Sequence, residues 1–476
     1  MLRNTSKFFL YASLASALVV LSATFFPFIG GKYYFFRISI EFSLIFLLLH
    51  WAFEAGPGEL GSLFRRAVSN PLFIAVSLFA FFYVLASFFA YDPSGAFWSN
   101  YERGEGGFQM MHYYIFFVLL TFHFRDWSSW RRAFYLFLSI ALLMILYGIL
   151  ANGVLEIPGV NSGADADRLV RFVGPYSSES LPESAWGRLT LARFQGTLGN
   201  PAYVAPFLMF SIFYASFLWL SSAEPKKKTG NANWKGWVAF SGLMLVFLFF
   251  FVLSQTRGAF LGLGAGGIAY LLSLFFARPQ ARKAIGGTLA GLLIVGGFLV
   301  YYRNTDVVKK IPGTRFLELA DVGLGDRTIQ TRFWTWNSAW QGFKERPILG
   351  WGPENFSITF DKYFDPRHFV PNMNTETWFD RAHNVVFDYL AATGVLGLLS
   401  YLGMLAVFYI EFFKRRFLKD PGRHGLSFHQ SALLFAMPMG YFVQGLALFD
   451  VLPIYINLFF FLALGHYFFY AHEDTR

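Results

Sequence analysis

Hydrophobic runs recur along the whole chain, separated by polar connections, and most are close to the roughly 20 residues that a helix needs to cross a bilayer. The pattern predicts an all-α polytopic membrane protein with about 12 transmembrane helices, forming a single integral membrane domain over 1–476. The predicted spans are 9–29, 33–53, 71–90, 109–124, 132–151, 202–222, 236–254, 258–277, 284–302, 384–413, 427–448 and 453–471.

The first and tenth runs need separate comment. The run at 9–29 follows Arg3 and Lys7 but lacks a small-residue cleavage site, so we interpret it as an uncleaved span and not as a signal peptide. The run at 384–413 is long enough to tilt or to project beyond the membrane.

Basic residues alternate from one connection to the next, which predicts the orientation of the chain. Positive charge favours the cytoplasmic side of short loops, so we expect both termini to be cytoplasmic. The basic residues assigned to that side are Arg3, Lys7, Arg65, Arg66, Arg125, Arg131, Arg132, Lys226, Lys227, Lys228, Lys235, Arg278, Arg282, Lys283, Lys414, Arg415, Arg416, Lys419, Arg423 and Arg476.

Composition agrees with a membrane protein. Charged residues make up 14% of the chain, against about 25% in soluble proteins. The absence of Cys excludes a disulfide scaffold, a zinc-thiolate site and a catalytic cysteine. The formal charge of +10 reflects the basic cytoplasmic loops, so we expect no nucleic-acid partner.

Two long connections are predicted on the opposite, extracytoplasmic face, at 152–201 and 303–382. Connections of this length are uncommon unless they are functional. The second is expected to be partly helical, because Trp336, Trp340 and Phe343 have helical spacing.

Arg193 and Arg257 are the first two candidate anion-binding residues. Arg193 precedes a Gly-Asn200-Pro201 turn, whose exposed backbone N–H groups favour an anion, although an interfacial arginine beside a helix start is an equal alternative. Arg257 lies in a short turn between two spans, where a charge needs an anionic ligand or an acidic partner.

Arg332 and His383 are the other two candidates. Arg332 shares a predicted helix with aromatic residues, and cation–π packing alone would explain it. His383, at the start of a span, belongs to the residue type best suited to proton transfer near neutral pH, although a lone interfacial histidine is more often structural.

Other patterns are weaker. Gly262–Gly267 contains GxGxxG but lies inside a span, so Gly258, Gly262 and Gly266 indicate a close helix contact and not a dinucleotide site. Asp165 and Asp167 resemble a metal-binding acidic pair but lie in a Gly- and Ser-rich loop typical of solvated turns.

Taken together, the motifs resemble those of the O-antigen ligase and polymerase superfamily of bacterial membrane glycosyltransferases. They occur in order along 190–400, and the most specific is the ligase-like His383-Asn384 pair followed by Gly394-x-x-Gly397-Leu398. The others are Arg193-x-x-Gly196 with Asn200-Pro201, Ser254-x-x-Arg257-Gly258-Ala259, Arg332-x-x-x-Trp336 and Pro347-x-x-Gly350-Trp-Gly352-Pro-Glu-Asn355-Phe356.

The resemblance implies a GT-C-like enzyme of the bacterial inner membrane with its active site on the periplasmic face. It would transfer a glycan en bloc from undecaprenyl diphosphate to a glycolipid acceptor, a lipid A core sugar, without metal or other cofactor. Arg193, Arg257 and Arg332 would hold the diphosphate and His383 would be the general base. The supporting residues would be Asn200, Arg381, Asn384 and Asp388.

Two kinds of alternative stay open. A polysaccharide polymerase or a protein O-oligosaccharyltransferase of the same superfamily would use the same residues. A transporter or flippase for anionic lipids or solutes belongs to another class, and it would place charges near the bilayer midplane on broken helices.

Overall fold

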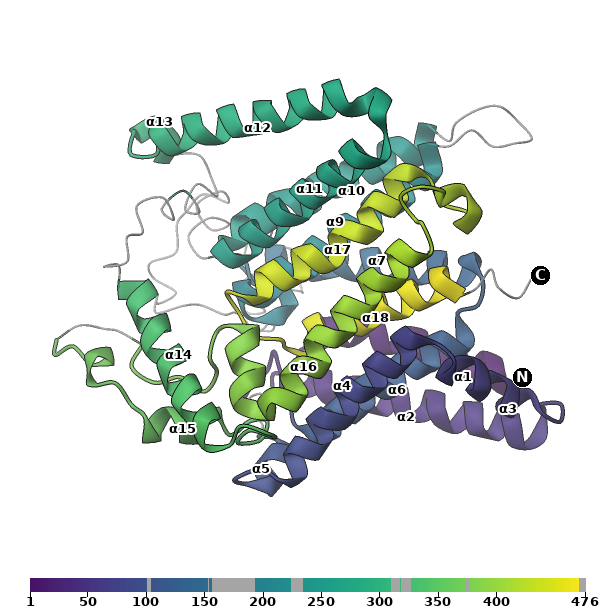
Figure 1. Ribbon diagram of the computed structural model, residues 1–476, viewed down its shortest axis with the longest axis horizontal. Helices are drawn as coiled ribbons and strands as arrows, with labels where there is room; N and C mark the ends of the chain where they lie inside the picture. The colour runs from purple at the N-terminus through teal and green to yellow at the C-terminus, as the bar shows by residue number, and fades with distance from the viewer. Residues whose placement is uncertain are drawn as a thin grey trace.

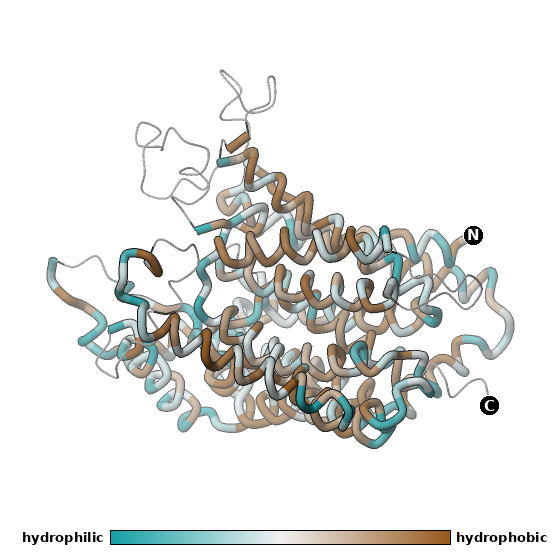
Figure 2. Tube along the Cα trace, turned by 90° about the horizontal axis from the view of Figure 1, so that it is seen from above, coloured by the Kyte–Doolittle hydropathy of each residue, from teal (hydrophilic) through white to brown (hydrophobic). Residues whose placement is uncertain are grey.

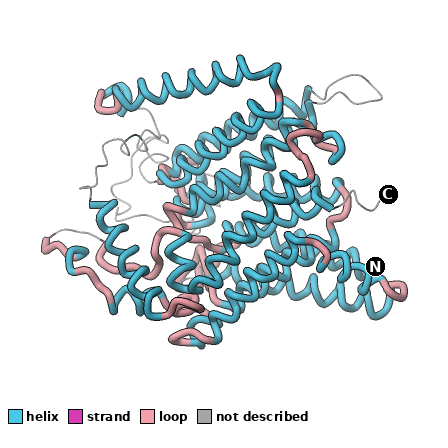
Figure 3. The backbone as a smooth tube through the Cα atoms, in the orientation of Figure 1, coloured by secondary structure: helices cyan, strands magenta, loops and turns pink. Residues whose placement is uncertain are grey.

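A computed structural model of the chain describes residues 1–100, 104–152, 154–155, 193–223, 234–309, 317, 327–372 and 376–470. Within these residues the regular elements are all helices, with no strand (Figure 3). They are α1 (Leu2–Leu14), η1 (Ala15–Leu18), α2 (Gly30–Phe53), α3 (Glu59–Val68), α4 (Pro71–Phe88), α5 (Pro93–Trp98), α6 (Gly107–His123), α7 (Trp127–Ala151), η4 (Gly196–Leu198), α9 (Pro201–Ala223), α10 (Trp234–Ser254), α11 (Arg257–Ala277), η5 (Pro279–Ala281), α12 (Arg282–Tyr301), α13 (Asp306–Lys309), α14 (Arg327–Glu345), α15 (Phe356–Lys362), η7 (Pro366–His368), α16 (Val385–Lys414), η8 (Pro421–His424), α17 (Phe428–Gly445) and α18 (Leu452–Tyr470).

The prediction of an all-helical polytopic membrane protein is confirmed. Nine helices in the described part of the chain are long and apolar enough to cross a membrane. They are α2, α4, α7, α9, α10, α11, α12, α16 and α18. Figure 2 shows hydrophobic residues along the helices of the bundle and hydrophilic residues gathered mainly where the chain turns.

The remaining three predicted spans fall on shorter or more polar helices. α6 has 17 residues, and α17 carries polar side chains that lower its hydropathy. The first span, predicted at 9–29, is displaced toward the N-terminus, because α1 and η1 end at Leu18. Residues 19–29 turn back toward α2, and Pro27 in this segment cannot continue a helix.

α18 lies inside the bundle and organises its core. Nearly all of its residues are buried, and it contacts α4, α6, α9 and α16. A helix that is apolar on every side is stable only when other helices or lipid surround it. In contrast, α12 has only Ile285 buried and lies at the edge of the bundle (Figure 1).

The helix contact predicted from the glycine spacing is confirmed. A Cβ added to Gly258 would lie 2.6 Å from Cβ of Ala447, and one added to Gly262 would lie 2.7 Å from Cβ of Gln444, both at the end of α17. One added to Gly266 would lie 3.0 Å from the ring of Phe213 in α9. Small residues therefore bring α11 against α17, as they do in other membrane bundles.

The two ends of the bundle differ in character. The N-terminus, α3, the C-terminal end of α18, and the connections from α11 to α12 and from α16 to α17 lie at one end (Figure 1). Helices α5, α13, α14 and α15 lie at the other end. The helix that was predicted around Trp336 and Trp340 is α14, so the candidate residues on it lie at this second end.

The long tenth span is broken at Gly394, which has φ 62° and ψ −164°. The break leaves helix carbonyls without their usual partners, and the segment before α15 supplies new ones. Trp351 N donates to Ala391 O at 2.9 Å and Gly352 N donates to Ala392 O at 2.9 Å. Two sequence motifs, Pro347–Gly352 and Gly394–Gly397, are thereby joined at the second end of the bundle.

Candidate active site

Arg193 holds the turn between α10 and α11. Its Nε donates to the carbonyl of Ser254 and its Nη2 to Oγ1 of Thr256, both at 2.9 Å. Thr256 in turn donates to the carbonyl of Pro201, the first residue of α9, at 3.1 Å. Two motifs far apart in sequence thus meet here, and Arg193 fixes the turn that carries Arg257.

Arg257 is the first residue of α11, a helix of 21 residues. The N-cap residue, Thr256, does not cap this helix with its side chain, because its hydroxyl donates to Pro201 instead. The N-terminus of a helix carries a partial positive charge and exposed N–H donors. The guanidinium therefore stands at a helix end that itself favours an anion.

Arg332, on α14, points to the same place from another part of the chain. Its Nη1 donates to the carbonyl of Ala447 at 3.1 Å, and Ala447 also packs against Gly258, the neighbour of Arg257. Burial lowers the pKa of Arg332, and the charge of Arg257 lowers this pKa further, whereas the carboxylate of Glu376 raises it. Arginine stays protonated in proteins, so the structure brings two positive charges together.

His383 lies beside this pair, just before α16. Its ring packs edge-on against Phe379 and Phe449, with centroids 5.4 and 5.1 Å away. Nδ1 lies 3.2 Å from the carbonyl of Arg381. Because a carbonyl only accepts, Nδ1 carries the proton in this contact, and Nε2 of the neutral ring keeps its lone pair.

The environment keeps His383 neutral. Its pKa is lowered first by burial and then by the charge of Arg332. The carboxylates of Asp380 and Asp388 oppose this shift. A neutral imidazole near the guanidinium group of Arg332 is suited to accept a proton near a bound anion.

Arg381 is clamped between two carboxylates. Its Nη2 pairs with Oε1 of Glu354, and its Nη1 lies 3.2 Å from Oδ2 of Asp388. The other oxygen of Asp388 accepts from the backbone N–H of Ala382 at 3.1 Å. Asp388 therefore makes no hydrogen bond to the His383 ring and instead fixes the backbone on which His383 stands.

α14 holds the same turn from the other side. Nε1 of Trp336 donates to the carbonyl of Ala382 at 3.0 Å, and its ring stacks on Phe387 with an interplanar angle of 12°. The Arg332-x-x-x-Trp336 motif therefore supplies one member of the arginine pair, Arg332, and a second residue, Trp336, that contacts the turn carrying His383. His383 itself has φ 52°, a left-handed conformation that costs a β-carbon residue energy and is often found at functional sites.

No role was predicted for Glu354, although it lies within the Gly352–Phe356 motif. Its side chain is 4% exposed, its φ is 63°, and its second oxygen accepts from the hydroxyl of Ser99 at 3.1 Å. The signal that points to it is charge balance. An arginine buried beside a candidate base needs a carboxylate partner, and Glu354 stands in a Gly- and Pro-rich turn.

Two more buried carboxylates near Arg381 were not predicted. Glu105 accepts from Tyr33 at 2.6 Å and from Tyr113 at 3.0 Å, and burial raises its pKa to about 8. Asp450 accepts from Tyr441 at 2.6 Å, and burial raises its pKa to about 7. Glu105 lies in a polar Gly-rich stretch beside Glu102 and Arg103, and Asp450 is a single acid between two apolar runs, so neither carries a distinctive sequence signal.

The predicted supporting asparagines begin helices. Oδ1 of Asn200 accepts from the backbone N–H of Ala202 at 2.8 Å, at the start of α9. Oδ1 of Asn384 accepts from Val386 N at 2.9 Å and caps α16. Their side chains thus set where the helices beside Arg193 and His383 start.

Among the described residues, no group of three or more His, Asp or Glu side chains is arranged to hold a metal ion. Asp165 and Asp167 lie outside the described residues.

Comparison with known proteins gives one family. Residues 242–402 match the family model described as O-antigen ligase, and this segment contains Arg257, Arg332 and His383. No curated protein matches the chain. The match confirms the resemblance carried by the motifs over this segment and supports the O-antigen ligase superfamily.

Proposed function

We propose that this protein is an O-antigen ligase-like glycosyltransferase that moves a glycan from a lipid diphosphate to an acceptor hydroxyl. The observation that carries the proposal is the meeting of Arg257, Arg332 and His383 around Ala447–Phe449. Two cations at the end of a helix suit a diphosphate, and a neutral imidazole suits proton abstraction.

The proposed reaction needs only side chains of this chain. Nε2 of His383 takes the proton of the acceptor hydroxyl while that oxygen forms a bond to the anomeric carbon of the glycan. The bond from this carbon to the diphosphate breaks on the opposite face, so the anomeric configuration inverts. Arg257 and Arg332 stabilise the charge that grows on the departing diphosphate, more in the transition state than in the substrate.

Arg193 is proposed to act in two ways. It positions Arg257 through its contacts to Ser254 and Thr256. It also adds positive charge near Arg257, where the diphosphate is proposed to bind. A lysine could not replace it fully, because a point charge cannot make two directed contacts at once.

The proposed setting is the bacterial inner membrane, with both termini in the cytoplasm and the site on the periplasmic face. The basic connections from α11 to α12 and from α16 to α17 support this orientation, because they lie at the end of the bundle opposite α14. The donor is proposed to be an undecaprenyl-diphosphate-linked glycan and the acceptor a sugar of the lipid A core.

One experiment tests the reaction class. The purified protein is incubated with a defined undecaprenyl-diphosphate glycan and candidate acceptors in the presence of EDTA, and products are identified by mass. Glycan joined to a lipid A core acceptor supports a ligase. If the glycan is joined only to a second lipid-linked glycan, the protein is a polymerase and not a ligase. The absence of any product would favour a transporter.

A further inference from the structure

An open cavity of about 610 Å³ lies at the end of the bundle that carries the basic connections (Figure 1). It forms where the end of α11, the connection from α16 to α17 and the first residues of α17 come together. Its size is within the range of small-molecule pockets, about 300–1,000 Å³. The candidate active-site residues Arg257, Arg332 and His383 do not line it.

Arg278 is the first cation of this cavity. It follows Ala277, the last residue of α11, and its guanidinium carbon lies 5.5 Å from the centre of the Phe428 ring. Within the described part of the chain its side chain forms no ion pair or hydrogen bond. A guanidinium held over an aromatic face still presents N–H groups around the edge of its plane. Arg278 is therefore held in place and keeps its donors for a further acceptor.

Lys419 and His429 bring two more donors to the cavity. Lys419, in the connection from α16 to α17, also forms no ion pair with any of the described residues. His429 is held by Tyr270, whose hydroxyl lies 2.7 Å from Nδ1. Nε2 carries a proton when Nδ1 accepts this hydrogen bond, and it also carries one when the ring is charged. Three segments of the chain thus bring a guanidinium, an ammonium and an imidazole to one cavity.

The lining carries a net positive charge. Asp420 is the only acid among the described residues that line the cavity, and it forms no ion pair with Arg278 or Lys419. Two fixed positive charges and one negative charge leave a surplus of one positive charge. This surplus is complementary to a ligand with one negative charge, such as a phosphodiester.

The position of the cavity along the membrane favours a lipid. α11 is one of the helices able to cross a membrane, and Arg278 directly follows its last residue. Phe276, in the last turn of α11, is 70% exposed, as expected of a side chain that contacts lipid. The cavity therefore lies at the level of the lipid headgroups, where basic pockets between helices bind phosphate groups.

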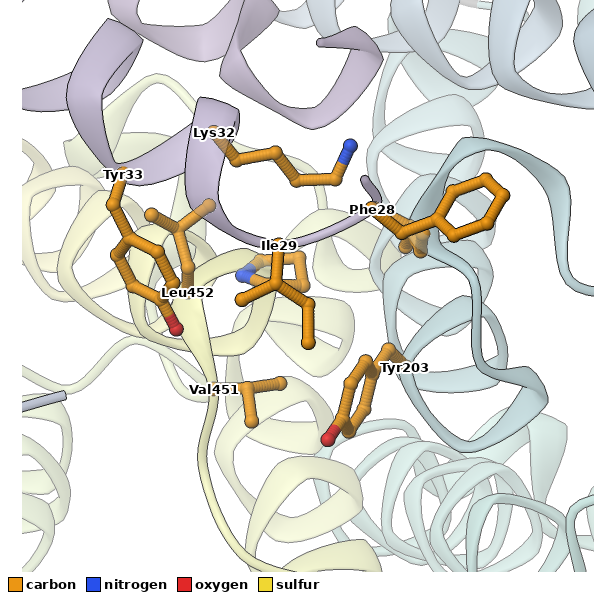
Figure 4. A pocket seen from close by; sticks show the side chains of 9 residues that line it. Phe28, Ile29, Lys32, Tyr33, Tyr203, Val451 and Leu452 are labelled. Carbon is orange, nitrogen blue, oxygen red and sulfur yellow. The ribbon is translucent and has the colours of Figure 1, made fainter. Parts of the chain in front are cut away.

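The cavity around Lys32 lacks these features. Its lining is mostly apolar, as Figure 4 shows for Ile29, Val451 and Leu452. Nζ of Lys32 donates to the carbonyl of Val19 at 2.5 Å, so its charge is directed to the backbone of the protein. Several cations line the cavity at the end of α11, and none of them is engaged in this way within the described chain.

We propose that the cavity at the end of α11 binds the phosphate group of an anionic membrane lipid. Arg278 and Lys419 neutralise the phosphate, and His429 donates a further hydrogen bond. Free phosphate offers the same chemistry, and a lipid differs from it in the acyl chains that the adjoining membrane holds in place. The site uses none of the residues of the proposed transfer reaction, so binding here is independent of that reaction.

Native mass spectrometry of the full chain in a neutral detergent tests the proposal, because this method counts each bound lipid separately. The protein is titrated with dioctanoyl phosphatidylglycerol, with dioctanoyl phosphatidylcholine as a zwitterionic control, and with inorganic phosphate. Arg278→Gln and Lys419→Gln each remove one positive charge. Both variants are expected to fold, since neither side chain forms a hydrogen bond or ion pair within the described chain.

Lys414→Gln is the matched control. Its side chain is 70% exposed, and it lies near the same end of the bundle, on α16, but outside the lining of the cavity. It removes the same charge without touching the proposed site.

Arg278→Gln and Lys419→Gln are each expected to weaken one bound phosphatidylglycerol about tenfold, the loss of one charge-assisted contact. Phosphatidylcholine binding, and the Lys414→Gln control, should show no such loss. An Arg278-dependent response to inorganic phosphate as strong as the response to the lipid would keep the phosphate site and replace the lipid as its source. Unchanged phosphatidylglycerol affinity in both variants, or an equal loss in Lys414→Gln, would overturn the proposal.

Discussion

Replacing Glu354 by alanine tests the clamp around Arg381. The pair is buried, with 5% and 4% of the two side chains exposed, and removing one partner of such a pair typically costs about 3–5 kcal/mol. Asp388 still contacts Arg381 at 3.2 Å in the variant. We therefore expect the low end, about 3 kcal/mol, because the remaining carboxylate compensates part of the charge.

The same substitution is expected to reduce transfer by about 100-fold, since a shift of about 1 Å in a catalytic group has that effect. The reason is geometric. The carbonyl of Arg381 holds Nδ1 of His383 at 3.2 Å, so movement of the Arg381 backbone misdirects Nε2. Glu354→Gln keeps the shape without the charge and should fall between wild type and Glu354→Ala.

The assay measures unfolding free energy by titration with sodium dodecyl sulfate in mixed micelles, and turnover per folded molecule with a lipid-linked donor. The control is Glu345→Ala, which removes an exposed pair to Lys362 at 2.7 Å. Exposed pairs contribute little, so this variant should behave like wild type. If Glu354→Ala were as stable and as active as Glu345→Ala, the clamp would have no positioning role.

Four further predictions follow from the site. His383→Ala should keep the stability of wild type but lose transfer in the donor and acceptor assay, and wild-type turnover would remove it as the base. Arg257→Lys should lose most activity because it cannot bind bidentately, and unchanged donor affinity and turnover would exclude it from the diphosphate site. Arg332→Gln should raise the pKa of His383, because its charge lowers that pKa, so the low-pH decline of the residual rate should move to higher pH; an unmoved profile would contradict this. Gly394→Ala should destabilise by about 1–3 kcal/mol, as its new Cβ would lie 2.4 Å from the carbonyl of Ile348; calorimetry showing an unchanged transition would refute the strain.

The family and the approximate positions of most membrane helices could be predicted from the sequence. Both depend on local features, namely hydrophobic run length and short motifs in a fixed order. The displaced first span shows the limit of this reasoning. Residues 19–29 are as apolar as a membrane helix. However, Phe28 packs against Gly199, and the carbonyl of Val19 accepts a hydrogen bond from Lys32, so tertiary contacts hold residues 19–29 in a turn.

The candidate residues themselves were predicted from the sequence, but the contacts that each of them makes were not. Spacing could not decide whether Asp388 orients His383, because the two are brought together only by the turn before α16. In the structure Asp388 contacts Arg381 and Ala382 instead. Likewise, the role of Glu354 depends on a contact across 27 positions, which no local pattern encodes.

The sequence by itself determined that this chain is a helical membrane protein with the motifs of the O-antigen ligase superfamily, because the bilayer sets the length of each hydrophobic run and each motif is continuous in the chain. Only the tertiary structure decided which charges meet. Arg257, Arg332 and His383 lie on three segments that join at the end of α17.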